Sequence, residues 1–119
     1  MVVKSLNEYE EKKEGTLKNL IGKVGCVVEF HGYVRRYSVK NGKKYEVTYL
    51  DIPNEITSHL EDVIKKAEQK FNVLRIIAYH NTGRLKVGEK ISSICVFSSH
   101  RNEAYQALEF VVSEIKKFH

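Results

Sequence analysis

The feature that most constrains this chain is the nearly unbroken apolar run VLRIIAY at residues 73–79, which is rich in β-branched side chains. A strand that is apolar on both faces has to be covered on both faces, so the run predicts a central strand with other elements packed above and below it. We therefore expect helices to pack on both faces of this strand, and other parts of the sequence have the spacing of helices.

Three further segments read as strands. Residues 24–34 alternate between apolar and polar side chains, which predicts a strand with one buried face. The segment SVKNGKKYEV contains Asn41-Gly42, a strong hairpin signal, and Tyr45, Val47 and Tyr49 follow at period two. We therefore expect a second strand that folds back antiparallel to the first, and a long strand from about 89 to 98 after turns at Gly83 and Gly88.

Helical spacing occurs in three places. Pro53 suits the first turn of a helix, and the apolar residues behind it are Ile56, Leu60, Val63, Ile64, Ala67 and Phe71. Ser98-Ser99 can cap a second helix, whose stripe is Ala104, Leu108, Val111, Val112 and Ile115. Residues 6–20 carry a partial stripe that predicts a helix at the start of the chain.

Composition fits one α+β domain spanning residues 1–119. The chain has 119 residues, of which 42% are hydrophobic, and this suffices for one core. The hairpin requires antiparallel pairing, so we expect an antiparallel or mixed sheet with two main helices. No apolar stretch is long enough to span a membrane or to act as a secretory signal, which predicts a soluble, cytoplasmic protein. Cys26 and Cys95 fall within strands and are expected in the core, without a disulfide or a zinc site.

Three positions are candidates for chemistry. His100 and Arg101 stand where a strand ends and a helix begins, a junction whose free N–H groups and helix dipole favour anions. Arg35 follows a strand and can bind phosphate or carboxylate with two parallel hydrogen bonds. Lys116 lies in the last turn of the final helix. The bland alternatives are a solvated first turn, an arginine that protects a sheet edge, and a lysine that complements the helix dipole.

The net charge of +5 favours an anionic partner only mildly. An isoelectric point near 9.2 and tyrosines such as Tyr33 and Tyr37 would also suit a small nucleic-acid binder. Basic residues are interleaved with acidic ones, however, and no known nucleic-acid motif occurs. Neither a metal cluster nor a cofactor motif is predicted.

The segments FHGYVRR at 30–36 and HNTGRLKVGEKISSICVFSSHRNEAYQALEFVVSEIK at 80–116, taken in order, resemble the large, catalytic subunit of molybdopterin synthase. In that family a strand ends in Phe-x-Gly-x-Val-Arg. A later His-x-x-Gly-x-Leu-x-x-Gly-Glu stretch leads through a strand to Ser-x-His-Arg and a helix that ends in lysine. The resemblance extends from about Val24 to Lys116 and implies a hammerhead-like single domain.

The resemblance also implies a reaction. A small ubiquitin-like carrier subunit would insert its thiocarboxylated Gly-Gly tail, and two sulfur transfers to cyclic pyranopterin monophosphate would give molybdopterin. By position, Tyr33, Val34 and Arg35 would line the substrate site, His100 and Arg101 would hold the anionic phosphate, and Lys116 would be the catalytic lysine. The partners implied are the carrier subunit and a second copy of the chain, within a heterotetramer.

Spacing adds a constraint on the site. Arg101 and Lys116 are 15 residues apart in the sequence, so on one continuous helix they stand roughly 22 Å apart, too far to touch one small pterin. If both serve one site, one of them comes from a second copy of the chain, which predicts a symmetric dimer with shared sites.

Two departures from the family pattern stand out. Asn81 occupies a place where the family usually has arginine, which removes a positive charge beside His80. The family's Pro-x-Trp-Lys-like segment, with its second functional lysine, is absent from this sequence. Three alternatives remain open: a truncated form, a natural short form in which Lys117 helps, and a catalytically impaired paralogue that acts as a dimeric binding module.

Overall fold

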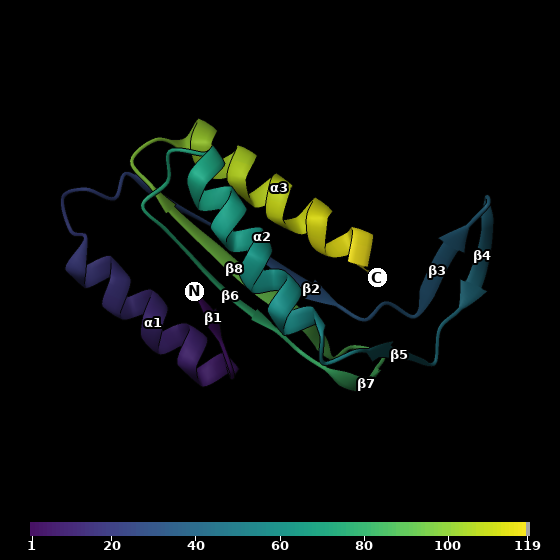
Figure 1. Cartoon of the computed structure of the whole chain (residues 1–119). Helices are drawn as coiled ribbons and strands as arrows, with labels where there is room; N and C mark the ends of the chain where they lie inside the picture. Colours follow the sequence, from purple (N-terminus) through teal and green to yellow (C-terminus); the bar gives the residue numbers. More distant parts are fainter. Residues whose placement is uncertain (119) are drawn as a thin grey trace.

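The computed structural model describes residues 1–118 and has an α+β fold built on one mixed four-stranded sheet (Figure 1). The sheet has the order β1-β6-β8-β2, in which β1 (Val2–Val3) runs parallel to β6 (Arg75–His80). The other neighbours, β6 with β8 (Lys90–Ser98) and β8 with β2 (Cys26–Tyr33), are antiparallel. The predicted α+β class is confirmed, and the apolar run at 73–79 does form an inner strand.

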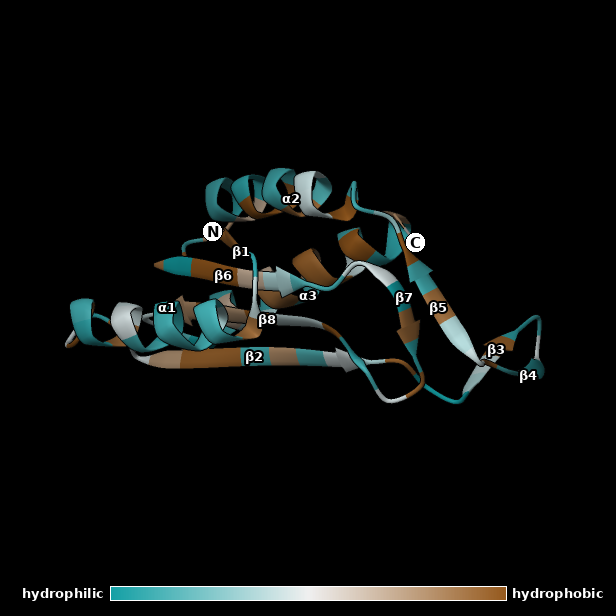
Figure 2. Cartoon of the chain, turned by 90° about the horizontal axis from the view of Figure 1, so that it is seen from below, coloured by the Kyte–Doolittle hydropathy of each residue, from teal (hydrophilic) through white to brown (hydrophobic). Residues whose placement is uncertain are grey.

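Helices cover both faces of this sheet, as the apolar run requires. On one face α2 (Ile56–Lys70) and α3 (Arg101–Phe118) pack against each other and against a cluster that includes Ile76, Ile94 and Val96. On the other face α1 (Leu6–Asn19) places Tyr9 against Ile77 and Phe97. Neighbouring residues of β6 and β8 thus point to opposite layers, and the hydropathy colouring in Figure 2 shows brown strands between helices whose outer sides are teal.

The Asn41-Gly42 turn forms as predicted, but its partner strands were predicted wrongly. Asn41 and Gly42 have φ angles of 53° and 75°, as a two-residue hairpin turn requires. They join β3 (Tyr37–Lys40) to β4 (Lys43–Glu46) in a separate two-stranded sheet, whereas β2 pairs with β8. In Figure 1 this hairpin projects from the body of the protein, at the end opposite α1.

The difference arises because the chain leaves the main sheet between Val34 and Tyr37, where β3 begins in a separate sheet. The β2–β8 register shifts at Gly32/Tyr33, and Val34 then becomes a buried core residue, 4% exposed. Its N–H donates to the carbonyl of Glu89 at 2.9 Å, and its carbonyl accepts from Gly88 N–H at 2.8 Å. These two bonds continue the antiparallel pairing one residue past β2, before the hairpin begins.

The predicted run from Tyr45 to Tyr49 is also divided between two sheets. After β4 ends at Glu46, β5 (Tyr49–Ile52) pairs antiparallel with β7 (Gly83–Lys86), a strand that the sequence did not predict. Gly83, expected at a turn, has a φ of 86° and begins β7. Pro53 precedes α2 rather than lying in its first turn, and its carbonyl accepts from Ile56 N–H at 3.2 Å.

Candidate functional site

One pocket lies where β2 and β6 end and β8 begins, beneath the last turns of α3. Its volume is about 540 Å³, within the usual range for small-molecule sites. Tyr33, Arg35 and Lys116, three of the residues singled out from the sequence, line it together. The other lining residues are Phe30, Gly32, His80, Ile91, Ser92, Ile94, Val112 and Ile115. The pocket therefore has an apolar floor and a rim that carries two cations.

The inward-facing side chain of Val34 sets the positions of Tyr33 and Arg35. Because Val34 is buried, the side chains on either side of it are directed outward, and both are exposed. Gly32 contributes space: a Cβ there would lie 3.2 Å from the Phe30 ring and 3.4 Å from the Ser92 hydroxyl. Val34 itself was expected in the substrate site, but it belongs to the core and does not line the pocket.

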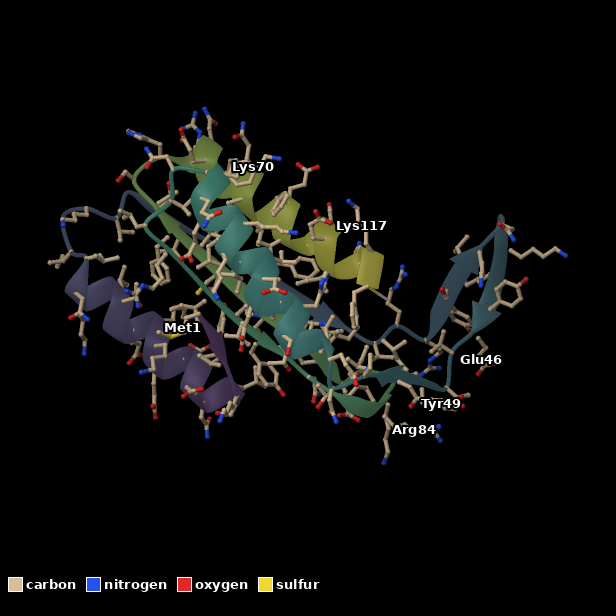
Figure 3. All side chains as sticks on the ribbon, in the orientation of Figure 1. Met1, Glu46, Tyr49, Lys70, Arg84 and Lys117 are labelled. Atoms are coloured by element: carbon tan, nitrogen blue, oxygen red, sulfur yellow. The ribbon has the colours of Figure 1, made fainter. Side chains whose placement is uncertain are left out.

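Lys116 reaches the pocket from the C-terminal end of α3. Val112 and Ile115 lie on the same side of the helix and also line the pocket, as spacings of three and four residues predict. Lys117 differs from Lys116: it pairs with Glu114 at 3.0 Å and does not line the pocket. Figure 3 shows Lys117 at the end of α3.

His80 is a pocket residue that sequence reasoning left without a role. It is 6% exposed, and its Nδ1 donates to the carbonyl of Asn81 at 2.8 Å. Asn81 fixes the segment after His80 to β8, because its side-chain amide donates to Lys90 O at 3.0 Å and its backbone N–H donates to Ile91 O at 2.8 Å. The sequence feature that could have identified His80 as a pocket residue is its position directly after the central apolar run at 73–79.

His100 and Arg101 lie at a different place. Both are exposed and line a second pocket of about 430 Å³, together with Gly25, Cys26, Ser99 and Asn102. The Ser98 hydroxyl accepts from His100 N–H at 3.3 Å, and the Ser99 hydroxyl donates to Lys23 O at 2.9 Å. Because α3 runs unbroken from Arg101 to Phe118, this pocket and Lys116 lie at opposite ends of one helix.

A third polar cluster lies under α1, on the far face of the sheet. Glu29 accepts from the Tyr9 hydroxyl at 2.7 Å and pairs with Lys13 at 3.3 Å, while His31 bonds to Ser93 at 2.9 Å. Burial opposes the charge of Glu29, but the Tyr9 hydroxyl and the Lys13 ammonium outweigh it and hold the pKa of the carboxyl below its usual value. Ser93 is 0% exposed, whereas the Glu29 and His31 side chains remain 28% and 32% exposed, so this cluster joins α1 to β2 at the surface of the protein.

Residues 1–118 offer neither a metal centre nor a membrane-spanning helix. No group of three or more His, Cys, Asp or Glu side chains is placed to hold a metal ion in that range. Within it, no helix combines the length and the apolar character that crossing a membrane demands. Cys95 is buried in the core as predicted, while Cys26 is half-buried and borders the second pocket; both are free thiols.

A family model, related sequences and solved structures all match this chain to the same group of proteins. Residues 5–118 match the family model described as MoaE protein. An uncharacterized protein of Methanocaldococcus jannaschii is 45% identical over 116 residues, which cover 95% of this chain and 98% of that protein. The molybdopterin synthase catalytic subunit of Pasteurella multocida is 33% identical over 94 residues, or 78% of this chain.

The alignment with the Pasteurella protein covers 61% of that protein's length, so this chain matches about three fifths of it. Among solved structures, the crystal structure of molybdopterin synthase from Staphylococcus aureus superposes with a TM-score of 0.67 at 25% identity. That match covers 97% of this chain and 81% of the other.

Proposed function

Because this chain belongs to the MoaE protein family, we propose that it acts in molybdopterin biosynthesis as the large, catalytic subunit of a molybdopterin synthase. In this role it transfers sulfur from the thiocarboxylated C-terminus of a small ubiquitin-like carrier subunit to cyclic pyranopterin monophosphate. The product is molybdopterin, the pterin that carries the dithiolene sulfurs. The observation that carries the proposal is the pocket at the end of α3, in which Arg35 and Lys116 meet.

The pocket supplies what this reaction needs. Both reactants are anions, a thiocarboxylate and a phosphate-bearing pterin, and two cations at the rim draw them together. Arg35 can bind an oxyanion with two parallel N–H bonds. Lys116 is the group proposed to stabilise the negative charge that develops during transfer. Phe30, Ile91 and Ile94 form apolar walls that favour the flat pterin ring.

His100 and Arg101 enter the proposal through a second copy of the chain. On one continuous helix they stand roughly 22 Å from Lys116, so they cannot reach the same pterin within one chain. In a symmetric dimer, the second pocket of one copy would adjoin the first pocket of the other, and two complete sites would form. With one carrier bound at each site, the assembly is a heterotetramer.

Reconstitution tests the catalytic proposal. Purified chain, thiocarboxylated carrier and cyclic pyranopterin monophosphate are mixed, and dithiolene-bearing molybdopterin is measured. Lys116→Ala should abolish product, whereas Lys117→Ala, its neighbour outside the pocket, should retain it. Equal rates in the two variants would remove Lys116 from the mechanism. Carrier binding without any product from the unmodified chain would favour the binding-module alternative.

Complementation tests the shared site. Lys116→Ala and His100→Ala/Arg101→Ala chains are each expected to be inactive alone. A heterodimer of the two contains one site with every group intact, so mixing them should restore activity to about a quarter of the wild-type level when subunits exchange at random. No restoration in verified heterodimers, or a wild-type chain that is monomeric while active, would contradict the shared-site proposal.

A further inference from the structure

The β3–β4 hairpin is rich in lysine and has no role in the chemistry proposed above. Residues 37–46, YSVKNGKKYE, contain three basic side chains and one acidic side chain. The hairpin packs mainly on itself, with β3 against β4. An isolated two-stranded hairpin is marginally stable in water, so its projection from the body suggests that a partner covers it.

The strand register divides the hairpin into two unlike faces. Residues directly opposite each other share a face, and Ser38 pairs with Tyr45 while Lys40 pairs with Lys43. One face therefore consists of Ser38, Lys40, Lys43 and Tyr45. We call these four residues the lysine face.

The charge on the lysine face is uncompensated. Like charges directly across a strand pair are destabilising, and across residues 1–118 no acidic group forms an ion pair with Lys40 or Lys43. Tyr45, on the same face, is 50% exposed. An exposed tyrosine beside two unpaired lysines is a composition suited to binding an acidic protein surface, because it combines an amphipathic ring with complementary charge.

The root of the hairpin adjoins the proposed catalytic pocket. Arg35 lines the pocket, and β3 begins two residues later, at Tyr37. The carbonyl of Arg36 accepts from Val47 N–H at 2.7 Å and fixes both strands at this root. Four residues of strand extend about 13 Å, so a protein whose tail fills the pocket has its folded body within reach of the hairpin.

We infer that the lysine face docks an acidic surface of the protein that delivers its C-terminal tail to the pocket. This inference rests on the proposed function and adds to it the surface that recognises the sulfur carrier. The carrier's body would neutralise Lys40 and Lys43, bury Tyr45 and orient the tail toward Arg35.

Single-stranded nucleic acid is the competing occupant, and ring accessibility disfavours it. Stacking of successive bases needs several open aromatic faces. Tyr45 offers one, but Lys44 Nζ lies 4.2 Å from the Tyr37 ring centroid and Arg84 lies 3.9 Å from that of Tyr49. Arg84 is also held by Asp51 at 3.0 Å. Figure 3 shows Tyr49 and Arg84 together, close to Glu46 at the foot of the hairpin.

The test measures the Kd of the full chain for its small carrier subunit, purified with an ordinary carboxylate end so that no turnover is needed. Lys40→Glu/Lys43→Glu should raise this Kd about tenfold or more at low salt, with a smaller effect at high salt. Lys12→Glu/Lys18→Glu on α1 makes the same charge change at the far end of the molecule (Figure 1) and should leave the Kd unchanged.

A second variant separates docking from folding. Lys40→Gln/Lys43→Gln removes both charges together with their mutual repulsion, so the hairpin should be at least as stable as before. Its Kd for the carrier should still rise, by about threefold. In steady-state assays the loss should appear in the KM for the carrier.

The outcomes distinguish the two proposals. A Kd that is equal in the wild type and both lysine-face variants overturns the docking inference, even if product forms normally. Loss of binding to a fluorescent single-stranded RNA, with carrier Kd unchanged, overturns it in favour of nucleic acid. If the wild type binds carrier and the lysine-face variants do not, but no product forms, docking stands and the proposed catalytic function falls.

Discussion

Gly25 is the position at which the smallest change should have the largest structural effect. It lies directly before β2, and its N–H donates to the carbonyl of Ser98 at 2.9 Å. A Cβ built on Gly25 would collide with the backbone carbonyl oxygen of Ser99 and would lie 3.0 Å from its carbonyl carbon. A backbone group cannot rotate aside as a side chain can, so Gly25→Ala must push apart the chain segments that precede β2 and α3.

The expected cost is that of inserting a methyl group where no space exists, about 1–3 kcal/mol. An unfolding entropy of about 2.1 cal/mol/K per residue gives about 0.25 kcal/mol/K for 119 residues. A destabilisation of about 2 kcal/mol therefore lowers Tm by about 8 °C. The displaced segment includes Ser99 and His100, so the second pocket should change shape as well.

Urea unfolding followed by circular dichroism is the assay, with Gly15→Ala as the matched control. Gly15 lies inside α1, and a Cβ added there would have no neighbouring atom within 4 Å. The control should gain up to about 1 kcal/mol from helix propensity, while Gly25→Ala should show a lower midpoint with an unchanged slope. A Gly25→Ala midpoint equal to or above the wild-type value would refute the steric reasoning.

Three further outcomes follow from the site and the core. Because the pKa of Glu29 is lowered in the fold, its stabilising effect is present above the pKa of an unfolded glutamate and is lost as pH falls through the lower folded value. Urea midpoints should thus fall more steeply on acidification for the wild type than for Glu29→Gln, and parallel pH curves would contradict this. Burial raises the pKa of Cys95 to about 11, so iodoacetamide at about pH 8 should spare it in the native protein and modify it in urea; rapid native labelling, located by mass spectrometry, would be inconsistent with its burial. Arg35→Lys should lower kcat/KM for the pterin about tenfold or more through loss of two-pronged binding, and an unaltered value would remove that contact from the proposal.

Much of the fold follows from local patterns in the sequence. The apolar run at 73–79 had to be an inner strand, because only a strand covered on both faces tolerates that composition. The change in the spacing of apolar residues after Ser98 predicted the end of β8 and the start of α3, and Asn41-Gly42 predicted a tight turn. The pairing of β2 was not predictable in this way, since pairing depends on contacts between residues more than 50 positions apart, such as Val28 and Val96.

The sequence also predicted part of the candidate site, namely which residues are suited to bind an anion. Residue types and spacing identified four candidates: Arg35, His100, Arg101 and Lys116. The helical rise alone predicts that Arg101 and Lys116 are farther apart than the length of a pterin.

Only the tertiary structure decided which of these residues share a pocket. Arg35, His80 and Lys116 line the same pocket, because strand ends that are distant in sequence pack beneath the C-terminal end of α3. The tertiary structure placed Val34 in the core, because the alternation along β2 continues to this residue and directs its side chain inward. It also placed the root of the β3–β4 hairpin next to the pocket, through Arg35. Residue chemistry is local and can be read along the chain, whereas the meeting of side chains is settled by the packing of the whole core.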